Sequence, residues 1–137
     1  MSGPSRTPEV LEITSTAGVV QARQLVRGLA QECRFSLVEQ TKLITAASEL
    51  ARNTLVHGGG GTLTASVVEK TGRRGVRLVF ADRGPGIADL ELALTDGWTS
   101  GGGMGLGLSG SKRLVDDFVV DTAVGEGTTV TVTKWAR

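Results

Sequence analysis

The stretch Phe80-Ala-Asp-Arg-Gly-Pro-Gly-Ile87 decides how the rest of the chain is interpreted. An apolar strand runs into it, and the carboxylate of Asp82 is followed by two glycines with a proline between them. Gly84 and Gly86 let the backbone turn sharply and approach a ligand closely, while Pro85 fixes one φ angle and removes one donor. Asp82 is then placed to accept a hydrogen bond from an amino group on a planar ring. An ordinary turn would also explain this string, so its meaning depends on the motifs around it.

Length and composition indicate one soluble domain. The 137 residues are 39% apolar and 21% charged, which is enough for a packed core. A net charge of +1 argues against broad electrostatic binding of nucleic acid or membrane. One cysteine excludes an internal disulfide and a cysteine metal cluster. No signal peptide or apolar run of spanning length is present, so we expect a cytoplasmic protein without nucleic-acid or membrane partners.

The first half of the chain predicts a disordered tail at 1–9 and then a single domain over 10–137. A short edge strand is expected at 10–13, followed by a helix over 16–31 whose apolar residues recur at three and four. Ser36 and Glu39 form a capping box that opens a long helix. That helix ends at His57, because the glycines that follow cannot continue it.

The second half predicts mainly strands. Two β-rich runs on either side of a solvated loop at 69–75 indicate an antiparallel hairpin. The further elements expected are strands at 62–68, 76–81, 118–123 and 128–134, and helices at 89–95 and 106–115. Together the elements predict an α+β fold, a two-layer sandwich with a mixed, mainly antiparallel sheet and helices on one face.

Glu49 and Asn53 lie four residues apart on the long helix, so they share a face with one turn between them. A carboxylate and a carboxamide near a helix end suit a hard cation such as Mg²⁺, or a base beside one. An exposed polar stripe would explain the same spacing. The pair therefore leaves a metal site and a solvated face both open.

The run Gly101-Gly-Gly-Met-Gly-Leu-Gly-Leu-Ser-Gly110 precedes a helix. Unpaired backbone N–H groups at a helix start bind phosphate, helped by the helix dipole. Residues 96–108 contain no lysine or arginine. An anion held there would need backbone donors and a metal ion, although Lys112 or Arg113 on the following helix can also serve.

Taken in order, these motifs resemble the ATPase and kinase superfamily of gyrase, Hsp90, histidine kinases and MutL. Within it the chain most resembles the small serine/threonine kinases that control bacterial sigma factors, especially the RsbT-type switch kinases. The resemblance covers residues 10–137 and implies a Bergerat-type ATP-binding fold. It is carried by Glu49-Leu-Ala-Arg-Asn53, Asp82-Arg-Gly-Pro-Gly-Ile87, Asp96-Gly-Trp-Thr-Ser100, Gly105-Leu-Gly-Leu108, Lys112-Arg-Leu-Val-Asp-Asp-Phe118, Gly125-Glu-Gly-Thr128 and Lys134-Trp135.

The resemblance implies ATP and Mg²⁺ as cofactors. Asn53 would be the Mg²⁺ ligand, Glu49 the general base, and Asp82 the adenine-binding aspartate, with Thr128 on the adenine side. Residues 96–104 would form a lid. Related kinases can carry an arginine just before the phosphate-binding glycines, and this chain has no arginine there. The other nucleotide-binding residues implied are Gly84, Gly86, Ile87, Gly103, Met104, Gly105, Leu106, Gly107 and Leu108.

The activity implied by the resemblance is that of a serine/threonine protein kinase. Its substrate would be a STAS-domain antagonist of an anti-sigma factor, which holds the kinase in a stressosome-type scaffold until it is phosphorylated. The released kinase would then bind and activate a phosphatase. Two alternatives stay open: an anti-sigma factor that sequesters a sigma subunit, and a pseudo-kinase that uses nucleotide only to hold its shape.

Overall fold

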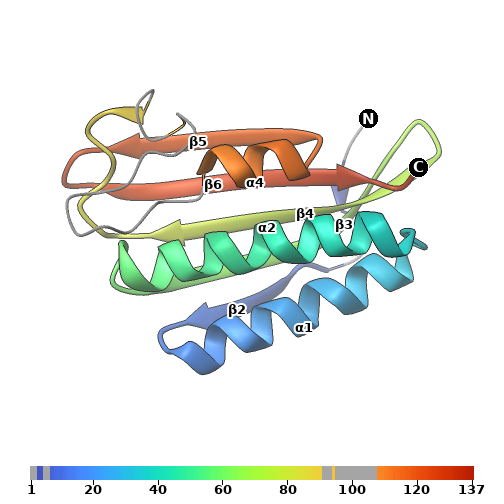
Figure 1. Ribbon diagram of the computed structural model, residues 1–137, viewed down its shortest axis with the longest axis horizontal. Helices are drawn as coiled ribbons and strands as arrows, with labels where there is room; N and C mark the ends of the chain where they lie inside the picture. The colour runs from blue at the N-terminus through green and yellow to red at the C-terminus, as the bar shows by residue number, and fades with distance from the viewer. Residues whose placement is uncertain (1–2, 5–6, 91–93, 95–107) are drawn as a thin grey trace.

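The computed structural model describes residues 3–4, 7–90, 94 and 108–137, which form a two-layer α+β sandwich. A six-stranded sheet has the order β1-β3-β4-β6-β5, with β2 also paired to β3. The described helices lie on one face of the sheet (Figure 1), so the expected fold class is confirmed. The strands are β1 (Gly3–Pro4), β2 (Glu9–Ile13), β3 (Gly61–Lys70), β4 (Arg73–Asp82), β5 (Asp117–Ala123) and β6 (Gly127–Trp135). The described helices are α1 (Thr16–Glu32), α2 (Leu37–Val56) and α4 (Leu108–Leu114).

The start of α2 follows half of the predicted capping box. The Ser36 hydroxyl accepts a hydrogen bond from the backbone N–H of Glu39 at 3.2 Å, as an N-cap serine should. The Glu39 carboxylate turns instead toward the sheet and pairs with the ammonium of Lys134 on β6, with 2.5 Å between Oε2 and Nζ. Because Lys134 is only 2% exposed, its buried charge accounts for this change of partner.

The β3–β4 connection is tighter than the loop expected at 69–75, and that expectation was wrong. The strands pair without a break as far as Lys70 and Arg73, so only Thr71 and Gly72 form the turn. Both have positive φ, 51° and 78°, which is the backbone of a type I′ hairpin. The charged residues of this segment therefore belong to paired strands.

The core lies between the sheet and the helices and fixes the position of α2. Alternate residues of β4 face the helices, and Leu78 and Phe80 are 0% and 2% exposed. They meet the inward residues of β6 in register, Val132 and Val130. Leu50 of α2 belongs to the same buried cluster, and burying each such side chain stabilises the fold by about 1.5–3 kcal/mol. This packing brings the C-terminal end of α2 beside the C-terminal end of β4.

Several other expectations differ from the structure in detail. Gly3–Pro4 pair with Val68–Glu69, although a disordered tail was expected there; β3 extends beyond β2 and leaves an edge free to pair. Every strand pair among the described residues is antiparallel. The prediction was a mixed, mainly antiparallel sheet, and no parallel pair occurs in this part of the chain. Most of the helix expected at 89–95 lies outside the described residues. Within the described part of the chain, no helix has the length and apolar character to cross a bilayer.

Candidate active site

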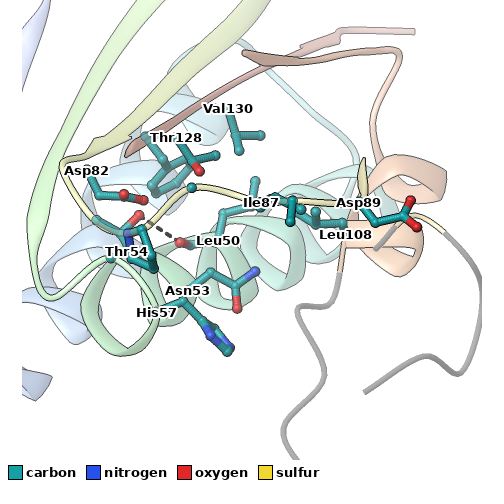
Figure 2. Close-up of a pocket in the computed structure, with 15 residues that line it drawn as sticks. Leu50, Asn53, Thr54, His57, Asp82, Ile87, Asp89, Leu108, Thr128 and Val130 are labelled. Carbon is teal, nitrogen blue, oxygen red and sulfur yellow. Dashed lines mark hydrogen bonds between the residues drawn. The ribbon is translucent and has the colours of Figure 1, made fainter. Parts of the chain in front are cut away.

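A cavity of about 310 Å³ opens where the ends of β4, β6 and α2 meet. Figure 2 shows Asp82 and Thr128 near one another, Asn53 and His57 extending from α2, and Asp89 beside Leu108 away from them. The walls of the cavity are mostly apolar, with a few carboxylate, amide, hydroxyl and imidazole groups. The lining residues are Leu50, Asn53, Thr54, His57, Gly58, Phe80, Asp82, Pro85, Gly86, Ile87, Ala88, Asp89, Leu108, Thr128 and Val130.

Asp82 is held in a fixed orientation at the end of β4. Its Oδ1 accepts a hydrogen bond of 2.9 Å from the backbone N–H of Gly84, an Asx turn that leaves Oδ2 available to a ligand. Gly58 lies against the Asp82 side chain, and a Cβ at Gly58 would overlap it. A Cβ at Gly127, whose φ is +95°, would likewise overlap the carbonyl oxygen of Asp82. The predicted glycine turn thus positions the carboxylate.

A hydroxyl network joins the glycine turn to the last two strands. The Thr122 hydroxyl accepts from the backbone N–H of Ile87 at 2.9 Å and lies 3.1 Å from the carbonyl of Gly127. It also lies 2.9 Å from the hydroxyl of Thr128. The hydroxyl of Thr122 can donate only one hydrogen bond. If that bond goes to the carbonyl of Gly127, the Thr128 hydroxyl donates to Thr122, and the lone pairs of the Thr128 oxygen stay available to a ligand. Thr122 was not identified from the sequence.

One face of α2 forms the opposite wall. Leu50, Asn53, Thr54 and His57 follow helical spacing along this face. The Thr54 hydroxyl is satisfied by the carbonyl of Leu50 at 2.9 Å, so its polar atom is occupied. His57 Nε2 is buried and has no hydrogen-bond partner in the described part of the chain. The sequence predicts His57 only as the end of this helix; its spacing of four from Asn53 is the signal that indicates a shared face.

The predicted site residues do not all line the cavity. Asp82, Gly86, Ile87, Leu108, Thr128 and Asn53 do, while Gly84 acts behind Asp82 through its N–H. Glu49 is exposed on α2, one turn before Asn53, and is not part of the described lining. The predicted phosphate residues Gly103, Met104, Gly105, Leu106 and Gly107 lie outside the described residues.

The charges of the cavity suit a nucleotide that brings its own cation. The described lining contains Asp82 and Asp89 but no lysine or arginine, so phosphate charge would need a metal ion. No cluster of three His, Cys, Asp or Glu side chains occurs among the described residues. A metal ion there would depend on the amide oxygen of Asn53 and on the phosphates, ligands that Mg²⁺ prefers.

Residues 38–137 match the family described as histidine kinase-, DNA gyrase B- and HSP90-like ATPase. The chain belongs to this family. Membership identifies the cavity-bearing region as an ATP-binding domain. This agrees with the position of Asp82, Asn53 and Thr128 around one cavity.

Individual relatives place the chain more narrowly within that family. It is 42% identical over 119 residues to the serine/threonine-protein kinase RsbT of Bacillus subtilis, covering 87% of this chain and 90% of that protein. It is 31% identical to the anti-sigma F factor of a Geobacillus species, covering 83% and 82%. The chain is thus a member of the RsbT-like branch of the family.

The fold is shared with a solved structure at much lower identity. A crystal structure of the RsbU and RsbW domains of a Mycobacterium tuberculosis protein matches with a TM-score of 0.66 and 20% identity. The match covers 96% of this chain and 33% of that longer one. The likeness supports the fold alone.

Proposed function

We propose that the chain is an ATP-dependent serine/threonine protein kinase acting on a STAS-domain antagonist of an anti-sigma factor. The observation that carries the proposal is that Asp82 and Asn53, far apart in the sequence, line one largely apolar cavity. Adenine is a planar apolar ring with an exocyclic amino group. Asp82 Oδ2 would accept from that group, since Oδ1 is already engaged by Gly84, and Ile87 and Leu50 would lie against the ring.

The phosphates would extend from the adenine pocket toward Asn53. Mg²⁺ arriving with the nucleotide would supply charge neutralisation that the described lining, without lysine or arginine, does not. The amide oxygen of Asn53 would be its protein ligand. The run Gly103–Gly107, which the sequence assigns to phosphate binding, would offer backbone N–H donors.

Glu49 would be the general base that removes the proton from a serine or threonine hydroxyl of the substrate protein. It lies one helical turn before Asn53 and is exposed. Exposure suits this role, because the accepting hydroxyl arrives from solvent on a separate protein. Catalysis would then consist of positioning and charge stabilisation, as phosphoryl transfer requires.

The proposed biological role is a partner switch. The antagonist would hold the kinase, within a stressosome-type scaffold where one exists, and phosphorylation would release it to activate a phosphatase. The support is the 42% identity to a serine/threonine kinase, over an alignment that covers 87% of this chain and 90% of that protein.

The test is to incubate the protein with Mg-ATP and a cognate STAS-domain protein and to map phosphoserine and phosphothreonine by mass spectrometry. Asn53→Ala should lower labelling about 100-fold or more without changing the melting temperature. Glu49→Gln should lower labelling but keep ATP binding, measured by calorimetry. Arg23→Gln, an exposed change on α1, is the control. Intact ATP binding with no labelled protein would contradict the kinase proposal.

An anti-sigma factor is the second candidate, and the anti-sigma F relatives at about 31% identity favour it. Its main act would be to sequester a sigma subunit. Pull-down with a purified sigma subunit in the presence of ATP distinguishes the two. Tight sigma binding with weak labelling of the antagonist would favour sequestration, and nucleotide binding with neither would identify a pseudo-kinase.

A further inference from the structure

A second cavity, which we name the arginine cleft, lies at the other end of β4 from the candidate active site. Its volume is about 460 Å³. It forms where the end of α1, the β3–β4 turn and the last residues of the chain meet. No acidic residue is part of the described lining, which consists of Cys33, Arg34, Thr71, Gly72, Arg73, Arg74, Ala136 and Arg137.

The backbone of the arginine cleft is unusual at two positions. Arg34 and Thr71, with φ of 60° and 51°, are the only non-glycine residues with positive φ in the described part of the chain. Both line this cleft. Arg34 follows the end of α1, where the Phe35 N–H reaches back to the carbonyl of Ala30 at 3.0 Å. Glycine is the usual residue in this motif, so folding alone does not call for an arginine there.

The guanidinium groups of the cleft are incompletely neutralised. Arg137 pairs with Asp116 at 2.6 Å, and Arg74 approaches Glu32 at 3.5 Å while its buried Nε has no hydrogen-bond partner. Arg34 and Arg73 are exposed and form no ion pair within the described residues. Positive charge therefore exceeds negative charge in a concave surface, which attracts anions.

We propose that the arginine cleft binds a carboxylate-rich segment of a partner protein. Arg74 and Arg137 already take carboxylates from within the chain, and the planar guanidinium pairs with carboxylates through two parallel hydrogen bonds. Cys33 and Ala136 add small apolar contacts to the cleft, as peptide sites commonly have. A net charge of only +1 argues against nucleic acid as the occupant, because such proteins carry a wider excess of basic residues.

The arginine cleft lies apart from the nucleotide cavity, so the binding of an acidic segment would be separate from nucleotide binding. The cleft includes Arg73 and Arg74 at the start of β4, whereas Asp82 at the end of β4 lines the nucleotide cavity. An acidic segment held in the cleft would leave that cavity open. The proposal does not depend on kinase activity, so either can fail without the other.

The test uses fluorescence anisotropy with a labelled peptide of Glu and Asp interspersed with Gly. The comparison peptide has Gln and Asn in their place. The cleft variant is Arg34→Gly with Arg73→Gln, in which glycine suits the positive φ and preserves folding. The control variant is Arg23→Gln with Arg27→Gln, which removes the same charge from exposed positions on α1. Thermal unfolding checks that both variants fold.

We expect the native protein to bind the acidic peptide and not the Gln/Asn peptide. The cleft variant should bind about tenfold more weakly, since exposed charge pairs contribute modestly each, and the control should stay within about twofold of native. The proposal is overturned by absent binding, by equal loss in both variants, or by a short RNA that binds more tightly than the peptide through Arg34 and Arg73.

Discussion

The two ends of the sheet are held together differently. At the cavity end, where β4 finishes at Asp82, glycines allow backbone segments to lie close together. At the hairpin end, beside the β3–β4 turn, long charged side chains join the sheet to α2. Gly58 and Gly127 let backbone and carboxylate lie against one another around Asp82. At the other end Lys134 and Glu39 join β6 to α2 through an ion pair in which the lysine is buried and the glutamate is partly exposed. The difference teaches that glycines alone bring the backbone against Asp82 at the cavity end, whereas at the hairpin end an ion pair acts beside a glycine contact, that of Gly75 with Trp135.

The comparison predicts that the largest effect comes from adding one methyl group at the cavity end. Gly127→Ala places a Cβ on a residue with φ of +95° and against the carbonyl of Asp82. We expect a loss of about 4 kcal/mol in the free energy of unfolding, measured by urea denaturation, together with loss of ATP binding. Gly28→Ala on α1, whose Cβ would meet nothing within 4 Å, should instead stabilise by up to about 1 kcal/mol. Equal effects would show that close approach is not what matters.

At the hairpin end the corresponding change removes a charge. Lys134→Met leaves Glu39, only 13% exposed, without its main partner, and should cost about 3 kcal/mol. Pairing with Lys134 lowers the pKa of Glu39 in the folded protein from its ordinary 4.5. The pair therefore stabilises the fold above about that pH, and the stabilisation is lost as the pH falls through the lowered folded pKa.

Denaturation at several acidic pH values checks this assignment. The native protein should lose stability with falling pH more steeply than Lys134→Met does. Adding Glu39→Gln to Lys134→Met should recover part of the loss, because it removes a carboxylate that keeps only its longer contacts to Lys42 and Arg137. No recovery in the double variant would contradict the ion-pair account.

A smaller effect is expected when the cavity end keeps its shape but changes its charge. Asp82→Asn preserves the acceptor for the Gly84 N–H but replaces the free carboxylate oxygen. ATP binding should weaken about 30-fold with unchanged stability, measured by calorimetry against GTP. Asp121→Asn on the exposed surface of β5 is the control. Unchanged preference for ATP over GTP would show that Asp82 does not contact the base.

The smallest effect is a gain. Arg34→Gly relieves a positive φ of 60° and should raise the free energy of unfolding by about 0.5–1 kcal/mol. The same change should weaken binding of an acidic peptide. A variant that is more stable yet binds less would mean that Arg34 contributes to recognition and not to folding; a less stable one would mean that its side chain holds the fold.

Part of the cavity lining was predictable from the sequence because the motifs that mark it are local. Asp82, Gly86 and Thr128 are each marked by neighbouring glycines, and helical spacing joins Asn53 to Glu49. Thr122 had no such signal, since its hydroxyl acts only after β5 pairs with β6. The exposure of Glu49 likewise depends on how α2 rotates against the sheet, which spacing alone does not determine.

The hairpin end was less predictable because its contacts join distant segments. Glu39 was interpreted as a helix cap, but its carboxylate pairs with Lys134 at the opposite end of the sequence. Arg34, Arg74 and Arg137 meet only when α1, the hairpin and the chain end come together. Charged residues in a turn-like segment are expected to face solvent. The local sequence pattern does not indicate that these arginines share a cleft.

The pairing of the first and last strands fixes where the chain enters and leaves the domain. Gly3 lies opposite Glu69 and Trp135 opposite Gly75, and Figure 1 shows β1 and the C-terminus on the side of the β3–β4 turn. A polypeptide joined to either end would emerge remote from Asp82 and Thr128. A longer protein could therefore include this fold without covering the cavity that Asp82 and Thr128 line.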